Sequence, residues 1–184
     1  MTSVITRRFG TWRGAARLAL SWPQHWLGIG RKKPSDPAAI KRLVFVCRGN
    51  ISRSAYADQL AKHSGLCSAS FGLHTNGGAP ADSIASKIGN ARDLNMTAHI
   101  SSGVADYKPQ VGDLLLAMEV RQLSALASNP KTQDIPRLLL GSFCNTPHLH
   151  DPFTLSADFY KSCFSRIDRA LISLAAEYPG ARLS

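Results

Sequence analysis

The chain has 184 residues, 44% of them hydrophobic, which suffices for one domain with a substantial core but not for two of ordinary size. The net charge is +10, yet residues 1–42 carry nine basic side chains against one acidic one, and the rest of the chain carries 13 against 11. Because the body is nearly neutral, we expect no nucleic-acid partner. The four cysteines show neither metal-site pairing nor the density of a secreted disulfide scaffold, so reduced thiols and a cytoplasmic location are expected.

Residues 1–40 are interpreted as a basic N-terminal extension that precedes the domain and contains all three tryptophans. Apolar side chains recur there at helical spacing, and most arginines fall elsewhere on the helical wheel. This pattern predicts an amphipathic helix that contacts the inner face of a membrane peripherally. It lacks the continuous apolar stretch of a transmembrane helix. An organellar targeting peptide, a disordered tail and a wrongly chosen start codon stay open as alternatives.

Residues 41–184 are expected to form the folded domain, because short apolar runs alternate with helical segments from Lys41 onward. The predicted strands are 43–46, 68–71, 113–118 and 136–140. The predicted helices are 54–63, about 80–91, a short one ending near 126, and a last one whose apolar stripe runs from 159 to 174. This order is typical of a three-layer α/β sandwich around a central four-stranded parallel sheet.

A cysteine follows the first predicted strand directly, and an Arg-Ser pair opens the next helix. In open α/β sheets, ligands bind at the carboxyl ends of strands, where helix N-termini present free N–H groups. The segment between strand and helix is therefore a candidate phosphate-binding loop, and its sequence is Cys47-Arg48-Gly49-Asn50-Ile51-Ser52-Arg53-Ser54.

Each residue type in this loop suits an anion site that also carries a nucleophile. The surrounding amides, the Arg53 guanidinium and the Ser54 hydroxyl favour a thiolate at Cys47. Arg53 offers a planar fork for two phosphoryl oxygens. Gly49 permits close backbone approach, and Asn50 tolerates a left-handed backbone, so that consecutive amides can turn inward.

The segment 44–58, VFVCRGNISRSAYAD, closely resembles the signature of low-molecular-weight protein tyrosine phosphatases. Residues 150–153, HDPF, and 156–160, SADFY, look like that family's Asp-Pro loop and the start of its final helix. The resemblance covers about residues 42–178 and implies a flavodoxin-like fold without metal or cofactor. It also implies a phosphotyrosine protein as the substrate, a bacterial tyrosine kinase being one candidate.

Carried over by position, the resemblance makes Cys47 the nucleophile that forms a phosphocysteine, Arg53 the phosphate binder and Asp151 the general acid and base. His99 would order Asn50 and so hold the shape of the loop. The residues implied to bind substrate are Arg48, Gly49, Asn50, Ile51, Ser52, Ser54 and Phe153.

Three positions depart from or refine the family pattern. Ser52 stands where many members have a second cysteine, so a protective disulfide with the nucleophile is not expected. Ile51 matches the tyrosine phosphatases, whereas members that resemble phosphoarginine phosphatases tend to have threonine there. Phe153 replaces a tyrosine that usually lines the cleft.

Two other functions are weighed against the phosphatase. An arsenate reductase of the same fold would need further cysteines as an electron relay, and Cys67 and Cys144 are too far apart in sequence to form the usual close pair. A phosphate-binding adaptor would need neither nucleophile nor acid. His148 and His150 next to Asp151 could suggest a metal site, but one short loop offers no second ligand cluster.

Overall fold

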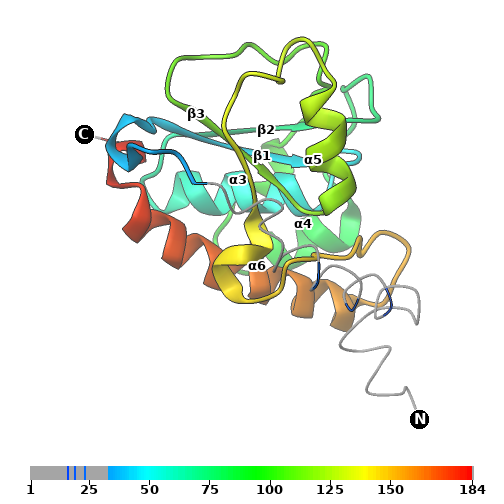
Figure 1. Ribbon diagram of the computed structural model, residues 1–184. Helices are drawn as coiled ribbons and strands as arrows, with labels where there is room; N and C mark the ends of the chain where they lie inside the picture. The colour runs from blue at the N-terminus through cyan, green and yellow to red at the C-terminus, as the bar shows by residue number, and fades with distance from the viewer. Residues whose placement is uncertain (1–15, 17–18, 20–22, 24–32, 184) are drawn as a thin grey trace.

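The computed structural model describes residues 16, 19, 23 and 33–183 (Figure 1). Its strands are β1 (Arg42–Cys47), β2 (Ser68–Gly72), β3 (Asp113–Ala117) and β4 (Arg137–Leu139). Its α-helices are α3 (Arg53–His63), α4 (Ser83–Asn90), α5 (Val120–Ala127) and α6 (Ala157–Glu177). Short 3-10 helices are η1 (Pro37–Ala39), η2 (Met96–Ala98), η3 (Leu140–Cys144) and η4 (Pro179–Ala181).

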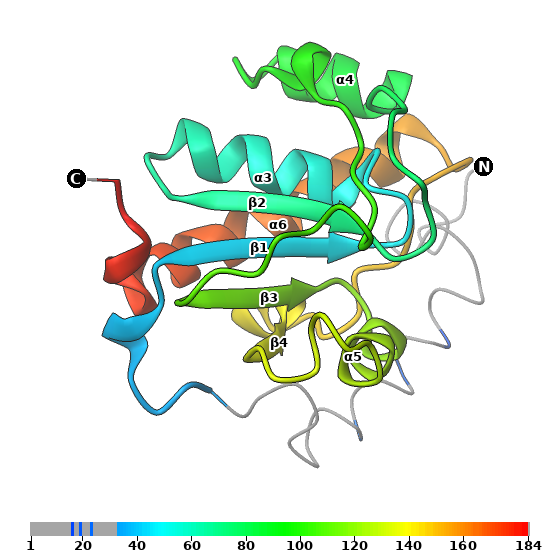
Figure 2. The same cartoon turned by 90° about the horizontal axis from the view of Figure 1, so that it is seen from above.

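The four strands form one parallel sheet in the order β2-β1-β3-β4, as Figure 2 shows from above. Helices α3, α4 and α6 cover one face of the sheet, and α5 lies on the other (Figure 1). The predicted three-layer α/β sandwich is therefore confirmed. Because β1 lies inside the sheet, its carboxyl end opens between the ends of β2 and β3, which is where parallel sheets place their ligands.

Side chains of β1 alternate between two separate cores, because successive residues of a strand point to opposite faces. Leu43 and Phe45 pack in the larger core beneath α3 and α6, whereas Val44 and Val46 pack in the smaller core beneath α5. All four are fully buried. A strand that is apolar on both faces is the feature that made this segment recognisable in the sequence.

The observed helix starts follow from capping side chains. Asp82 accepts hydrogen bonds from the N–H groups of Ile84 and Ala85, so α4 begins at Ser83 and not near residue 80 as predicted. Ser156 caps α6 by accepting from the N–H of Phe159. The last strand is also shorter than predicted, spanning residues 137–139 before η3 begins.

The amphipathic pattern predicted within residues 1–40 lies almost entirely outside the described residues, so both it and the domain boundary near residue 41 stay predictions. Within the part of the chain that the structure describes, no helix combines the length and the apolar character that crossing a membrane requires.

Candidate active site

The loop after β1 is fixed in place by the end of the neighbouring strand β2. The N–H of His74 donates to the carbonyl of Arg48 over 2.8 Å, and the N–H of Leu73 donates to the carbonyl of Cys47. Gly72 allows this approach, because a Cβ there would lie 2.9 Å from the Arg48 carbonyl oxygen. A side chain at position 72 would thus push the loop away from the sheet.

The thiol of Cys47 is buried, accepts a hydrogen bond from one backbone N–H of its own loop and lies within hydrogen-bond distance of a hydroxyl. Its Sγ lies 2.9 Å from the Ser54 hydroxyl oxygen and 3.2 Å from the backbone N of Asn50. The Asn50 amide nitrogen donates to the same hydroxyl oxygen over 2.9 Å. A Cys47 thiolate has no hydrogen to donate, so in that state the Ser54 hydroxyl is the donor to sulfur while its oxygen still accepts from Asn50.

Asn50 holds the loop in a left-handed conformation, with φ of 55°. Asparagine adopts this region at lower cost than most other residues. Its side-chain oxygen accepts from the N–H of Ser102, which fixes the orientation of the amide. His99 Nε2 lies 2.7 Å from the Asn50 carbonyl. Because a carbonyl only accepts, His99 must donate from Nε2, as a positioning residue for the loop.

A partly buried chain of polar side chains continues from Asn50 to α3. The Asn50 amide nitrogen also donates to the Ser70 hydroxyl over 2.9 Å, and Ser70 donates to the carboxylate of Asp58 over 3.2 Å. Asp58 in turn accepts from Ser68. The hydroxyls of Ser68 and Ser70 thus both donate to Asp58, and the strand β2, which carries them, takes part in orienting the loop.

The Arg53 guanidinium is anchored by one of its terminal nitrogens. Nη1 lies 2.7 Å from a carboxylate oxygen of Glu119 and 2.7 Å from the carbonyl oxygen of Leu149. The side chain is only 1% exposed. Burial opposes its charge, but the carboxylates of Asp151 and Glu119 and the Cys47 sulfur raise the pKa of Arg53, so the fork remains a cation.

The other edge of the Arg53 fork is directed away from these anchors. Nε and Nη2 make no hydrogen bond of normal geometry with the residues that the structure describes, although both are buried. Nη2 forms an ion pair with Asp151 at 2.6 Å. A guanidinium edge with two adjacent donors is the shape that binds two oxygens of a phosphate.

Glu119 was missed by the sequence reasoning, although it holds Arg53 in position. Burial alone would raise its pKa, but Arg53 and Arg121 outweigh burial and bring the pKa to about 2. Glu119 therefore stays ionised and keeps its ion pairs at neutral pH. Glu119 comes two residues after the end of β3. Ligand-binding residues gather at the carboxyl ends of neighbouring parallel strands, and this principle, which indicated Cys47, could also have indicated Glu119.

A cavity of about 320 Å³ opens over the loop. Seven of the predicted site residues line it together with His74, which was not predicted: Cys47, Arg48, Gly49, Ile51, Ser52, Asp151 and Phe153. Asn50, Arg53 and Ser54 lie beneath it, fully or almost fully buried. His99 contacts the loop from behind and does not line the cavity. The structure thus brings Asp151 from a distant segment to the Cys47 loop.

Asp151 is held at the mouth of this cavity, with 28% of its side chain exposed. Its second oxygen accepts from the N–H of Phe153 over 3.3 Å, so that both oxygens are oriented. Phe153 itself is half exposed. Within residues 33–183 no group of three or more His, Cys, Asp and Glu side chains is placed to hold a metal ion.

A cysteine at the end of a buried strand, which lines one cavity with an aspartate and has a buried arginine fork beneath it, is the arrangement that a cysteine-dependent phosphatase requires. Residues 42–181 match the family of low molecular weight phosphotyrosine protein phosphatases, and the chain belongs to that family. The resemblance inferred from the sequence is thereby confirmed, and the protein is an enzyme of the hydrolase class.

Individual relatives are similar at moderate identity. The low molecular weight protein-tyrosine-phosphatase Wzb of Salmonella typhi is 29% identical over 131 residues, which is 70% of this chain and 88% of Wzb. The crystal structure of the tyrosine phosphatase AmsI of Erwinia amylovora is 25% identical with a TM-score of 0.65, covering 74% of this chain and 92% of AmsI. The arginine phosphatase YwlE was solved as a cysteine-to-serine mutant with a phosphorylated active-site serine. It is 25% identical with a TM-score of 0.61, and the match covers 73% of this chain and 93% of YwlE.

Proposed function

We propose that this phosphatase hydrolyses phosphotyrosine in proteins through a phosphocysteine at Cys47, with Arg53 as phosphate binder and Asp151 as general acid and base. The observation that carries the proposal is that Cys47 and Asp151 line one cavity while the Arg53 fork lies beneath it, 2.6 Å from Asp151. Nucleophile, anion binder and proton donor thus face the same space.

In the first step the Cys47 thiolate attacks phosphorus, the S–P bond forms, and the P–O bond to the phenol breaks. The phosphoryl oxygens are held by Nε and Nη2 of Arg53 and by loop N–H groups. The N–H groups of Arg48 and Gly49 and the Nε of Arg53 have no hydrogen-bond acceptor among the described residues, and Nη2 of Arg53 has only its ion pair with Asp151. Such donors, aimed before the substrate arrives, stabilise the charge of the transition state.

Asp151 donates its proton to the leaving phenolate oxygen in this first step. In the second step the Asp151 carboxylate takes a proton from water, the water oxygen attacks phosphorus, and the S–P bond breaks. The products are inorganic phosphate and free enzyme.

The side walls of the cavity support an aryl substrate. Ile51 and Phe153 line it, and apolar side chains of this kind can pack against a tyrosine ring. Family members that resemble phosphoarginine phosphatases tend to have threonine at this position, and this chain has Ile51 instead. The similarity to YwlE, which is an arginine phosphatase, makes phosphoarginine the comparison that matters most.

The test is a kinetic comparison of one peptide sequence carrying phosphotyrosine, phosphoserine or phosphoarginine, with arsenate reduction measured in parallel. We expect the largest kcat/KM for phosphotyrosine and no arsenate-dependent thiol oxidation. A larger kcat/KM for phosphoarginine would overturn the proposed substrate, and arsenate turnover would overturn the reaction class.

Replacing Asp151 with asparagine separates its role in proton transfer from a role in binding. General acids contribute about a hundredfold or more to rate. We expect kcat/KM to fall about a hundredfold for phosphotyrosine, whose leaving group needs a proton, and less than about tenfold for p-nitrophenyl phosphate, whose leaving group does not.

Asp134→Asn is the matched control for this variant, because Asp134 is an exposed aspartate that does not line the cavity. Its kcat/KM should equal that of the wild type for both substrates. Equal losses on the two substrates in Asp151→Asn would remove Asp151 from the general-acid role.

The burial of two other cysteines, Cys144 and Cys163, supports hydrolysis over arsenate reduction. Burial raises the pKa of the Cys163 thiol to about 12, and burial raises the pKa of Cys144 as well. Thiols that stay protonated are poor electron relays, because the thiolate is the reactive form. None of the four cysteines forms a disulfide.

The partner is a phosphoprotein, and a bacterial tyrosine kinase is our proposal for its identity. Peripheral contact of residues 1–40 with the inner face of a membrane likewise stays a prediction from the sequence, because those residues lie almost wholly outside the described part of the chain.

A further inference from the structure

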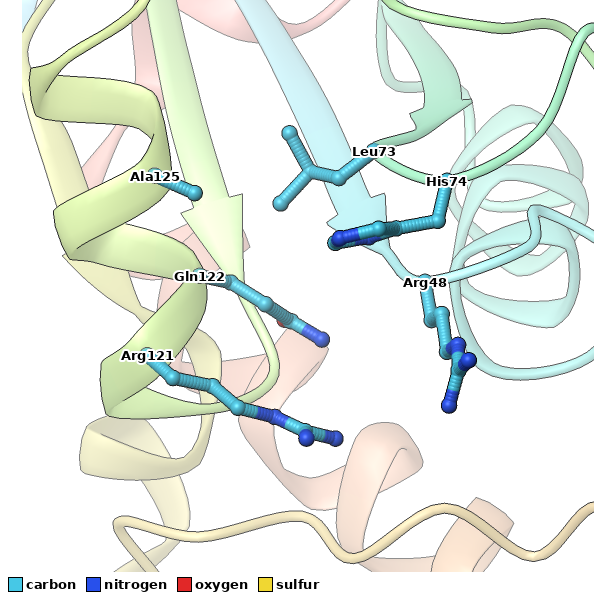
Figure 3. Close-up of a pocket in the computed structure, with 6 residues that line it drawn as sticks. All are labelled: Arg48, Leu73, His74, Arg121, Gln122 and Ala125. Atoms are coloured by element: carbon cyan, nitrogen blue, oxygen red, sulfur yellow. The ribbon is translucent and has the colours of Figure 1, made fainter.

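A second cavity adjoins the one that holds Cys47. It measures about 390 Å³ and is lined by Arg48, Leu73, His74, Arg121, Gln122 and Ala125 (Figure 3). Arg48 and His74 line both cavities, so the two share a wall. A substrate whose phosphate lies at Cys47 could therefore extend directly into the second cavity.

The second cavity is cationic on two sides. In Figure 3, Arg121 and Gln122 reach from α5 toward the side on which Arg48 and His74 lie. No aspartate or glutamate is among the lining residues. The Arg48 side chain is exposed and makes no ion pair or hydrogen bond with the residues that the structure describes. Its charge is thus available to a ligand.

Arg121 is also available, although it has a carboxylate partner. Its Nε lies 2.8 Å from Glu119, which orients the guanidinium from behind. The Glu119 side chain is 1% exposed, whereas that of Arg121 is 54% exposed. Glu119 shares its single charge between Arg121 and Arg53. The side chain of Arg121 is therefore held in place and still presents N–H donors to solvent.

The chemistry of the walls defines what the cavity would take. Two guanidinium groups facing one space bind a carboxylate or a phosphoryl group, because both present oxygens to planar donors. Leu73 and Ala125 add an apolar patch for the carbon atoms of the side chain that carries this group.

We propose that this cavity is a second anion-binding subsite, which takes an acidic side chain located close to the phosphotyrosine in the substrate. The inference rests on the proposed function, since it assumes that a phosphotyrosine occupies the neighbouring cavity. It makes Arg48 and Arg121 specificity-determining residues of the enzyme.

The experiment measures kcat/KM of the full chain on phosphotyrosine peptides that differ only in the flanking residues, which are alanine, glutamate or phosphoserine. Single exposed ion pairs contribute up to about 1 kcal/mol, so we expect about a fivefold preference for an acidic peptide over the alanine peptide. The larger of the two preferences assigns the subsite to a carboxylate or to a phosphoryl group. High salt should reduce either preference.

Two variants locate the effect in the cavity. Arg121→Gln should reduce the ratio of acidic-peptide to alanine-peptide kcat/KM to below about twofold. Ala125→Glu places a carboxylate on an exposed lining position and should abolish or reverse the preference. Ser124→Glu is the matched control, because Ser124 is exposed on the same helix and does not line the cavity. Its ratio should stay close to that of the wild type.

Each variant is judged by its own ratio of acidic-peptide to alanine-peptide kcat/KM, in which a general loss of activity cancels. A loss that arises because the substitution at Arg121 disturbs Glu119 therefore cannot imitate the result. Equal kcat/KM for acidic and alanine peptides in the wild type would overturn the subsite while leaving phosphotyrosine hydrolysis intact. An unchanged preference in Ala125→Glu would overturn its location. Absence of hydrolysis for every phosphotyrosine peptide would instead contradict the proposed function itself.

Discussion

A Cys47→Ser protein is expected to show no measurable hydrolysis of aryl phosphates while it still binds inorganic phosphate. The thiolate is stabilised by the Ser54 hydroxyl and the Asn50 N–H, at 2.9 Å and 3.2 Å. A serine hydroxyl stays protonated at neutral pH and is a far weaker nucleophile. Loss of a catalytic nucleophile lowers kcat by about a millionfold in a well-studied hydrolase, so turnover should fall below detection here.

Phosphate binding should survive in this variant, because the Arg53 fork and the loop N–H groups remain. Binding is measured by calorimetry with inorganic phosphate. Cys67→Ser is the matched control, since Cys67 lies outside the cavity and should tolerate the change with normal turnover. Substantial hydrolysis by Cys47→Ser would show that another group attacks phosphorus.

An Arg53→Lys protein is expected to lose about a thousandfold in kcat/KM, even though the charge is kept. Arg53 uses Nη1 to hold Glu119 and the Leu149 carbonyl, and it directs a second edge with two donors toward the cavity. A lysine has one compact ammonium group, which cannot reach both the anchors and the phosphate. The phosphate therefore loses its two-point contact.

Arg169→Lys is the control for this change, because Arg169 is exposed on α6 and does not line the cavity. The fall in Arg53→Lys should appear both in kcat/KM and in the affinity for inorganic phosphate, measured at a temperature where circular dichroism shows the variant folded. Near-normal phosphate affinity in a folded Arg53→Lys protein would contradict the bidentate role of the fork.

The fold and the centre of the site could be predicted from the sequence because they depend on local pattern. The strand before Cys47 is apolar on both faces, which only a buried parallel strand requires. Asp151 could be identified only through the resemblance, because nothing in its own neighbourhood ties it to Arg53. The contact of 2.6 Å between them is created by packing.

Other parts of the site were not predicted because they depend on contacts between distant segments. The resemblance predicted that His99 orders Asn50, but the atom that it contacts is the Asn50 carbonyl oxygen, a backbone atom that no sequence pattern marks. Glu119 looks like an ordinary helix-start residue until Arg53 is placed beside it. The cationic second cavity needs the turn after β2 and the start of α5 to face each other, which follows from the strand order.

The most direct test of the account is to find the covalent intermediate on Cys47. The Asp151→Asn protein is mixed with radiolabelled p-nitrophenyl phosphate and quenched rapidly. This substrate permits the first step without a proton donor, whereas loss of the base slows the hydrolysis of the intermediate. The account predicts labelled phosphorus on the peptide that contains Cys47, accumulating above the wild-type level. Turnover without any protein-bound phosphorus, or label on a different residue, would contradict it.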